Sequence, residues 1–201
     1  MKRKAAILLL ATAIAGCDDS NEFNIAENNF FPLQVGNYWE LYPPDQNPLN
    51  EQVVVKMEIT DTQLFSGIEY FLMVTRTETP NGVYADSTYY RVDENGFVFK
   101  RLKTGEISNP YRLGAGDGSR WSSSVPPGEK DMQVDYYTTP VEINTTHING
   151  CRLFSFNVDG IIDEEHWTTL APNIGIVTMH SAWGFRRDLK KAIINGVEYN
   201  F

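Results

Sequence analysis

The side chains that could bind a metal ion are spread along the chain rather than gathered in a motif. The three histidines are His147, His166 and His180, and none belongs to a His-x-x-x-His pair or lies near a pair of cysteines. In the segment Asp163-Glu164-Glu165-His166, Glu164 and His166 would share one face of a strand. We interpret this segment as the solvated start of a strand. We therefore predict no metal site and no cofactor.

A catalytic site is equally hard to assemble from sequence motifs. The segment Gly116-Asp117-Gly118-Ser119 lacks the regular acidic spacing of a calcium loop. No serine lies in a Gly-x-Ser-x-Gly motif, and no Ser-x-x-Lys motif occurs with its usual partners. Paired carboxylates that could cleave a glycoside stay open, because spacing along a chain says little about distance in space. We predict no catalytic residue and no enzymatic activity.

Aromatic side chains are numerous enough to line a sugar platform or an apolar cavity. Core packing is the usual role of such residues. Adjacent aromatic residues such as Tyr89 and Tyr90 must point to opposite faces of a strand, so one of them is exposed or lines a second apolar layer. The candidate ligand-lining residues are Tyr90, Tyr137, Trp167 and Trp183.

The first residues of the chain have the features of a signal sequence that ends at a cysteine. A basic start at residues 2–4 precedes an apolar run over residues 5–14, and the small residues Ala15 and Gly16 precede Cys17. The apolar run is too short to span a bilayer as a mature helix. Small residues let a peptidase reach the backbone between Gly16 and Cys17. We predict that residues 1–16 are a removed signal peptide.

The segment Ile14-Ala15-Gly16-Cys17 resembles the lipobox of bacterial lipoproteins. The resemblance implies that Cys17 becomes the new N-terminus, is diacylated on sulfur and is often acylated on nitrogen, with chains such as palmitate. Two or three acyl chains make a stable anchor, so the membrane would be a partner through Cys17. The alternative is an ordinary secretory signal with a chance cysteine.

The residues after the cysteine are polar and acidic as far as Asn29, and we interpret residues 17–29 as the lipidated cysteine with a tether. In the lipoproteins that the lipobox resembles, acidic residues directly after the cysteine act as sorting signals. They retain the protein at the inner membrane in some bacterial groups and send it to the cell surface in others. We expect a location in the cell envelope, with the outer membrane favoured over the inner membrane. A merely soluble tether is the alternative.

Charge and cysteine usage exclude some partners. Removal of residues 1–16 leaves 185 of the 201 residues, with 14 Lys and Arg against 26 Asp and Glu, a formal charge of −12. This charge argues against nucleic acid, which needs basic patches, and against broad docking on anionic lipid. Lipidation of Cys17 would leave Cys151 unpaired. We expect Cys151 to be buried as a small apolar residue.

From Phe30 onward the sequence predicts β-strands. Val53, Val55, Met57 and Ile59 would lie on one face of a strand, with Lys56, Glu58 and Thr60 on the other. Turn signals of the Asn-Gly and Asp-Gly type recur between short alternating segments, which favours an antiparallel meander over a parallel fold. Residues 186–194 could form a helix, although the Asn195-Gly196 pair that follows suits a hairpin equally well.

The two halves of this region are similar, which predicts an internal repeat over about residues 31–110 and 111–201. Several segments of the first half match segments of the second half in the same order. One example is the segment from Leu33 to Trp39, which corresponds to the segment from Leu113 to Trp121. We predict one all-β domain over residues 30–201, an antiparallel meander of about ten strands that forms a curled sheet, a half-barrel or a barrel. The segments that begin the two halves, Leu33 to Trp39 and Leu113 to Trp121, resemble those of uncharacterised envelope lipoproteins. At the level of the fold, the predicted sheet resembles the half-barrel carriers of the lipoprotein-sorting system and lipocalin-like barrels.

Two functions follow as hypotheses. The first is a non-enzymatic binding or carrier module that holds an apolar small molecule within the curled sheet. The alternative is a structural or interaction lipoprotein that recognises an envelope protein or a glycan. An apolar cavity would support the first hypothesis, whereas an exposed aromatic patch would favour the second. An enzyme with two facing carboxylates is a distant third.

Overall fold

The computed structural model of the protein describes residues 29–44, 53–125, 130–158 and 165–201. The predicted signal peptide and Cys17 lie outside these ranges. Every helix or strand within them is a β-strand, which confirms the predicted all-β class. None of the described residues forms a helix long and apolar enough to cross a membrane.

The described residues form thirteen strands, rather than about ten. Residues 186–194, for which a helix was one possibility, form a strand. The short β6 strand contains Pro110, which weakens its sequence pattern but is tolerated because β6 lies at an edge of the sheet. The strands are β1 (Tyr38–Tyr42), β2 (Val54–Phe65), β3 (Ile68–Thr79), β4 (Gly82–Val92), β5 (Phe97–Arg101), β6 (Ile107–Arg112), β7 (Arg120–Val125), β8 (Lys130–Ile143), β9 (Thr146–Val158), β10 (His166–Ala171), β11 (Gly175–Ser181), β12 (Arg186–Ile194) and β13 (Val197–Asn200).

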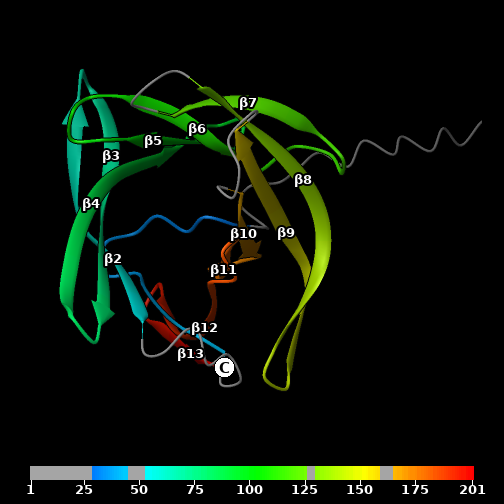
Figure 1. Cartoon of the computed structure of the whole chain (residues 1–201). Coiled ribbons are helices and arrows are strands. Elements are labelled where there is room, and N and C mark those ends of the chain that lie inside the picture. The colour runs from blue at the N-terminus through cyan, green and yellow to red at the C-terminus, as the bar shows by residue number, and fades with distance from the viewer. Residues whose placement is uncertain (1–28, 45–52, 126–129, 159–164) are drawn as a thin grey trace, which may run out of the picture.

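All strands belong to one curled antiparallel sheet, which wraps around an interior (Figure 1). Its order is β6-β5-β4-β3-β2-β1-β12-β11-β10-β9-β8-β7, and β13 pairs with β12 beside β11. Neighbouring strands are consecutive in the chain except at β1 and β12, where Trp39 pairs with Ala192. This one long-range pairing joins the first six strands to the rest of the sheet.

The two edge strands approach each other without closing the sheet. The backbone N–H of Asn109 in β6 donates to Ser123 Oγ in β7 at 3.1 Å. The indole Nε1 of Trp121 in β7 donates to the carbonyl oxygen of Asn109 at 3.3 Å. These side-chain contacts connect β6 and β7 without a backbone ladder between them. Of the predicted shapes, the structure is therefore the curled sheet that does not close into a barrel.

The segment that precedes β1 crosses the interior of the curled sheet, where it is drawn in blue in Figure 1. Phe30 and Phe31 in this segment are both buried and belong to the main hydrophobic core. Because their rings pack against strands from both halves, the segment contributes to the core of the whole sheet.

The start of β1 is locked to distant turns. Trp39 is only 2% exposed, and its Nε1 donates to the carbonyl oxygen of Ile174 at 2.6 Å. Gly175 has a φ of +88°, and a Cβ there would lie 3.1 Å from the Trp39 ring. Asn37 Oδ1 accepts from the backbone N–H of Asn195 at 2.8 Å.

Trp121, which the predicted repeat relates to Trp39, is also buried. The repeat itself stays a prediction.

Candidate functional site

The interior of the sheet is occupied by the protein's own aromatic rings. The ring centre of Phe31 lies 5.3 Å from that of Tyr90 and 5.6 Å from that of Tyr111. Tyr111 in turn lies 5.0 Å from Phe154 and 5.8 Å from Phe156. Burial raises the pKa of the Tyr90 phenol well above its ordinary value, as expected for a hydroxyl in apolar surroundings. These contacts fill space that a carrier would keep for its ligand.

The candidate ligand-lining residues are distributed between the interior and the surface. Tyr90 packs in the interior, while Trp183 is 68% exposed in the turn between β11 and β12. Trp167 lies in β10, with its ring centre 5.1 Å from that of His180 in β11. The side chain of Tyr137 is outside the described part of the chain. Tyr90 and Trp183 therefore do not line a common cavity.

The turn between β11 and β12 presents two exposed aromatic side chains, Trp183 and Phe185, which we call the aromatic tip. Phe185 is 49% exposed. The backbone closes the turn through hydrogen bonds from the Ser181 N–H to the Phe185 oxygen and from the Gly184 N–H to the Ser181 oxygen, both 3.0 Å. The N–H of Ala182 also donates to the Glu165 oxygen at 2.8 Å. The tip is thus a turn stabilised by backbone hydrogen bonds, with two apolar rings exposed to solvent.

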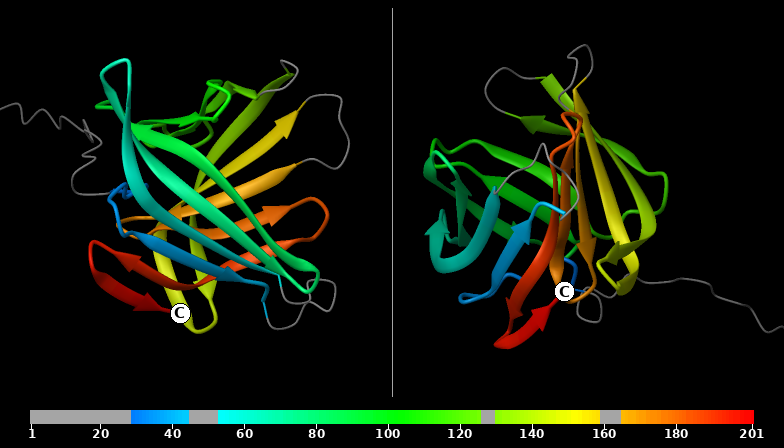
Figure 2. Two further views of the ribbon diagram at one scale, coloured as in Figure 1. Left: turned by 90° about the vertical axis from the view of Figure 1, so that its left-hand side faces the viewer. Right: turned by 60° about the horizontal axis from the view of Figure 1, so that its bottom comes forward.

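The aromatic tip lies at the opposite end of the sheet from the place where the described chain begins. Asn29 accepts a backbone hydrogen bond of 2.9 Å from Asn173, which lies in the turn before β11. The tip follows β11, whose seven residues span about 23 Å at the usual rise of a strand. The left view of Figure 2 shows the blue N-terminal segment and the orange turn at opposite ends of the sheet.

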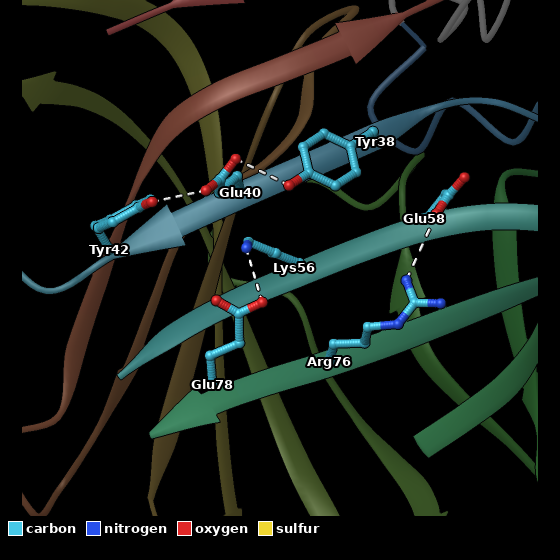
Figure 3. A network of polar contacts seen from close by, with 7 residues as sticks. All are labelled: Tyr38, Glu40, Tyr42, Lys56, Glu58, Arg76 and Glu78. Atoms are coloured by element: carbon cyan, nitrogen blue, oxygen red, sulfur yellow. Dashed lines mark hydrogen bonds and ion pairs between the residues drawn. The ribbon is translucent and has the colours of Figure 1, made fainter. Parts of the chain in front are cut away.

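A network of charged and phenolic side chains covers the outer face of β1, β2 and β3 (Figure 3). Glu40 accepts hydrogen bonds from Tyr38 at 2.9 Å and from Tyr42 at 2.7 Å. Lys56 and Glu78 form an ion pair of 2.7 Å on the neighbouring strands. The Glu40 hydrogen bond is the main cause that raises the pKa of Tyr42 to about 12. Because its donors and acceptors are matched within the sheet, we interpret this network as a structural element.

Replacement of Glu40 by glutamine is expected to make the free energy of unfolding depend less on pH in the acidic range. Partial burial alone would raise the pKa of Glu40, but the hydrogen bonds from Tyr42 and Tyr38 outweigh it and lower the pKa below its ordinary value of 4.5. A carboxylate whose pKa is lower in the folded state stabilises the fold above the unfolded value, and this contribution is lost as the pH falls through the folded value.

The measurement is urea unfolding of the wild type and the Glu40→Gln variant, from neutral pH to below pH 4.5, the ordinary value for Glu40. We expect the wild type to lose stability more steeply than the variant in the acidic range. Glu69→Gln, at an exposed position of the same sheet, is the matched control. Parallel profiles for the wild type and the Glu40 variant would contradict this role.

The histidines do not come together as a site. His166 stacks on Phe156 with ring centres 4.5 Å apart, whereas His180 lies beside Trp167. The Nε2 of His147 lies 3.9 Å from a carboxylate oxygen of Glu142. No group of three or more His, Cys, Asp or Glu side chains that could hold a metal ion occurs within the described ranges.

Cys151 has the buried environment that its sequence context predicted. The side chain is fully buried, and its Sγ donates to the carbonyl oxygen of Ile148 at 3.3 Å. Burial raises the pKa of the thiol to about 11, so the thiolate is scarce at neutral pH. The expectation of a small apolar core residue is confirmed.

Two residues with functional potential were missed by the sequence reasoning. Phe185 is separated from Trp183 only by Gly184, and this Trp-Gly-Phe spacing between two strand patterns could have indicated an exposed aromatic turn. Arg112 had no such signal, because the aromatic rings beside it come from different strands, Phe97 in β5 and Trp121 in β7.

No protein-family model matches the chain, and no curated protein matches it. Two solved structures resemble it. One is a lipoprotein candidate from Parabacteroides distasonis ATCC 8503, with 14% sequence identity, a TM-score of 0.46 and coverage of 81% of this chain and 97% of that chain. The other, from Bacteroides fragilis NCTC 9343, is a candidate exported protein with a YmcC-like fold, with 13% identity, a TM-score of 0.47 and coverage of 81% and 98%.

Proposed function

We propose that the protein is a lipid-anchored lipoprotein of the cell envelope that recognises a glycan through the aromatic tip. The anchor is Cys17, supported by the lipobox-like segment that ends at this residue. The observation that carries the recognition role is the exposure of Trp183 and Phe185 on a hydrogen-bonded turn. Contiguous exposed apolar surface is a feature of interaction sites on folded proteins.

The position of the tip suits a protein attached at its N-terminal end. Eleven residues lie between Cys17 and Asn29, so the twelve Cα–Cα steps limit the reach of the tether to about 40 Å. Asn29 contacts the turn before β11, and the tip follows β11. A tether from Cys17 would therefore enter the sheet at the end opposite the tip.

The small size of the tip favours a glycan over a folded protein as the partner. Stable protein interfaces bury more than about 1,000 Å² in total, whereas a sugar ring needs only one or two aromatic faces. Trp183 and Phe185 offer two rings in a short turn that also contains Gly184. Recognition of an envelope protein is the competing outcome of the test.

The packing of the interior counts against an apolar carrier. Phe30 and Phe31 occupy the centre of the curled sheet and pack against Tyr90, Tyr111 and the cation of Arg152. A carrier would have to expel this segment before it could accept a lipid chain. No contact among the described residues favours that rearrangement.

The test is binding of the full lipidated protein, in a nonionic detergent, to an array of bacterial envelope polysaccharides. The double variant Trp183→Ala and Phe185→Ala is expected to lose at least about tenfold in affinity, because both stacking faces are removed. Tyr84→Ala is the matched control, since Tyr84 is an exposed ring on a different hairpin, with 61% of its surface accessible.

Equal glycan binding by the wild type and the double variant would overturn the assignment to the tip. Absence of glycan binding together with tip-dependent binding of a purified envelope protein would replace the glycan by a protein partner. Stoichiometric uptake of a fluorescent fatty acid that depends on Tyr90 would instead restore the apolar carrier.

A further inference from the structure

A second surface feature lies at the seam between β5, β6 and β7, at the end of the sheet where the described chain begins. It is an open hollow of about 570 Å³ that we call the seam hollow. Figure 1 shows these three strands together along one side of the curled sheet. The polar and aromatic residues that line the hollow are Asn95, Phe97, Arg112, Ser119, Arg120 and Trp121.

The residues that line the seam hollow include two cations, Arg112 and Arg120, and no acid, although Arg120 pairs with Asp135 across β7 and β8. The whole chain has 26 acidic against 17 basic residues. Two nearby acids are engaged elsewhere. Asp117 Oδ1 accepts from the backbone and hydroxyl of Thr138 at 2.5 and 2.7 Å, and Asp93 Oδ1 accepts from the N–H of Phe97 at 2.8 Å.

The guanidinium of Arg112 lies beside two aromatic rings. Its Cζ lies 5.4 Å from the ring centre of Phe97 and 5.2 Å from that of Trp121. Phe97 pairs directly with Arg112 across β5 and β6, and Trp121 is a buried residue of β7. The rings hold the planar guanidinium in place, so little freedom is left for it to lose when it binds an anion.

The Arg112 side chain also has an unsatisfied donor. Its Nε is buried and has no hydrogen-bond partner. A buried N–H without an acceptor is unfavourable, so an anion oxygen that reached the Arg112 Nε would satisfy it. An arginine presents two N–H groups side by side that match two oxygens of one phosphate or carboxylate.

We propose that the seam hollow binds a phosphate group, with Arg112 as its principal ligand. A phosphate fits better than a carboxylate, because Arg112, Ser119 and Asn95 together offer donors for more than two oxygens. The phosphate could come from a lipid headgroup or from a free phosphate. The lipid source rests on the proposed anchoring at Cys17, because the chain enters at this end of the sheet.

The experiment is a calorimetric titration of the full lipidated protein, in a nonionic detergent, with inorganic phosphate and with acetate. The wild type is expected to prefer phosphate, and Arg112→Gln is expected to weaken phosphate binding about tenfold or more. Arg186→Gln is the matched control, because Arg186 is an exposed arginine at the opposite end of the sheet. Unchanged binding by Arg112→Gln, or tighter binding of acetate than of phosphate, would overturn the proposal.

A second variant and a second ligand sharpen the result. Arg112→Lys retains the charge but loses the paired donors, so it is expected to bind phosphate several-fold more weakly. This variant decides the case if the glutamine variant does not fold, and wild-type affinity in it would contradict the role of the guanidinium. Soluble dihexanoyl phosphatidylglycerol that competes with phosphate assigns the site to lipid, whereas phosphate binding without competition assigns it to a free phosphate.

The outcome is separable from that of the proposed function. The Trp183 and Phe185 variant is expected to bind phosphate normally, since the aromatic tip lies at the other end of the sheet. A variant that loses glycan binding at the tip is therefore expected to retain phosphate binding. Arg112→Gln is expected to lose phosphate binding and to retain glycan binding.

Discussion

Replacement of Trp39 by alanine is expected to destabilise the fold by about 3–5 kcal/mol, the usual cost of removing a large buried aromatic side chain. Trp39 is 2% exposed, packs against Gly175 and donates to the Ile174 oxygen at 2.6 Å. The substitution leaves a cavity between β1 and the turn before β11, and it leaves a carbonyl oxygen unpaired. It also weakens the place where the two parts of the sheet are joined.

The measurement is thermal and denaturant unfolding of the full chain, where the expected loss corresponds to a fall in the melting temperature on the order of 10 °C. Trp39→Phe separates the two contributions, because it retains a ring and loses the indole hydrogen bond, which is worth about 1 kcal/mol. Trp183→Ala makes the same change at an exposed site and is expected to stay within about 0.5 kcal/mol of the wild type. A Trp39→Ala variant as stable as Trp183→Ala would contradict this account.

Replacement of Cys17 by serine is expected to release the protein from the membrane. A hydroxyl cannot form the thioether bond that the lipobox resemblance implies, and a chain without residues 1–16 would have a formal charge of −12 that opposes binding to anionic lipid. Each buried methylene contributes about 0.8 kcal/mol to membrane binding, so loss of two acyl chains removes essentially all of it.

The check is membrane fractionation together with mass spectrometry of the N-terminal peptide. Cys151→Ser is the matched control, because Cys151 is the other cysteine of the chain and is buried in the core. That variant is expected to stay in the membrane fraction. Retention of the Cys17→Ser protein in the membrane without an acylated peptide would mean that an ordinary signal sequence or a partner protein holds it there.

Much of the local structure followed from the sequence because strands leave a local signature. Alternation over Val53 to Ile59 predicted the strand that forms as β2, and Asn95-Gly96 and Asn195-Gly196 predicted turns that the structure contains. Side-chain alternation and positive φ at a turn depend on a few neighbouring residues. The strands that the sequence did not predict clearly, such as β6 and β13, are short and lie outside the centre of the sheet.

The candidate sites were less accessible to sequence reasoning. Trp183 was selected for a cavity, and the structure places it on a turn in solvent. The difference arises because an aromatic residue in a strand-rich sequence carries no sign of which face or which end of the sheet it will occupy. The seam hollow was not foreseen, because Phe97, Arg112 and Trp121 belong to three strands that meet only after the sheet has curled.

The sequence by itself determined the all-β class, the antiparallel hairpins and the lipobox-like segment at Cys17, since each depends on residues that are close along the chain. Only the tertiary structure decided that β1 pairs with β12, that Phe30 and Phe31 pack in the interior, and that Arg112 lies beside rings from two other strands. Those contacts join residues far apart in sequence, and they form because the curled sheet must bury its inner face against something. Phe30 and Phe31 help to bury that face, which is why we place the proposed recognition on the surface.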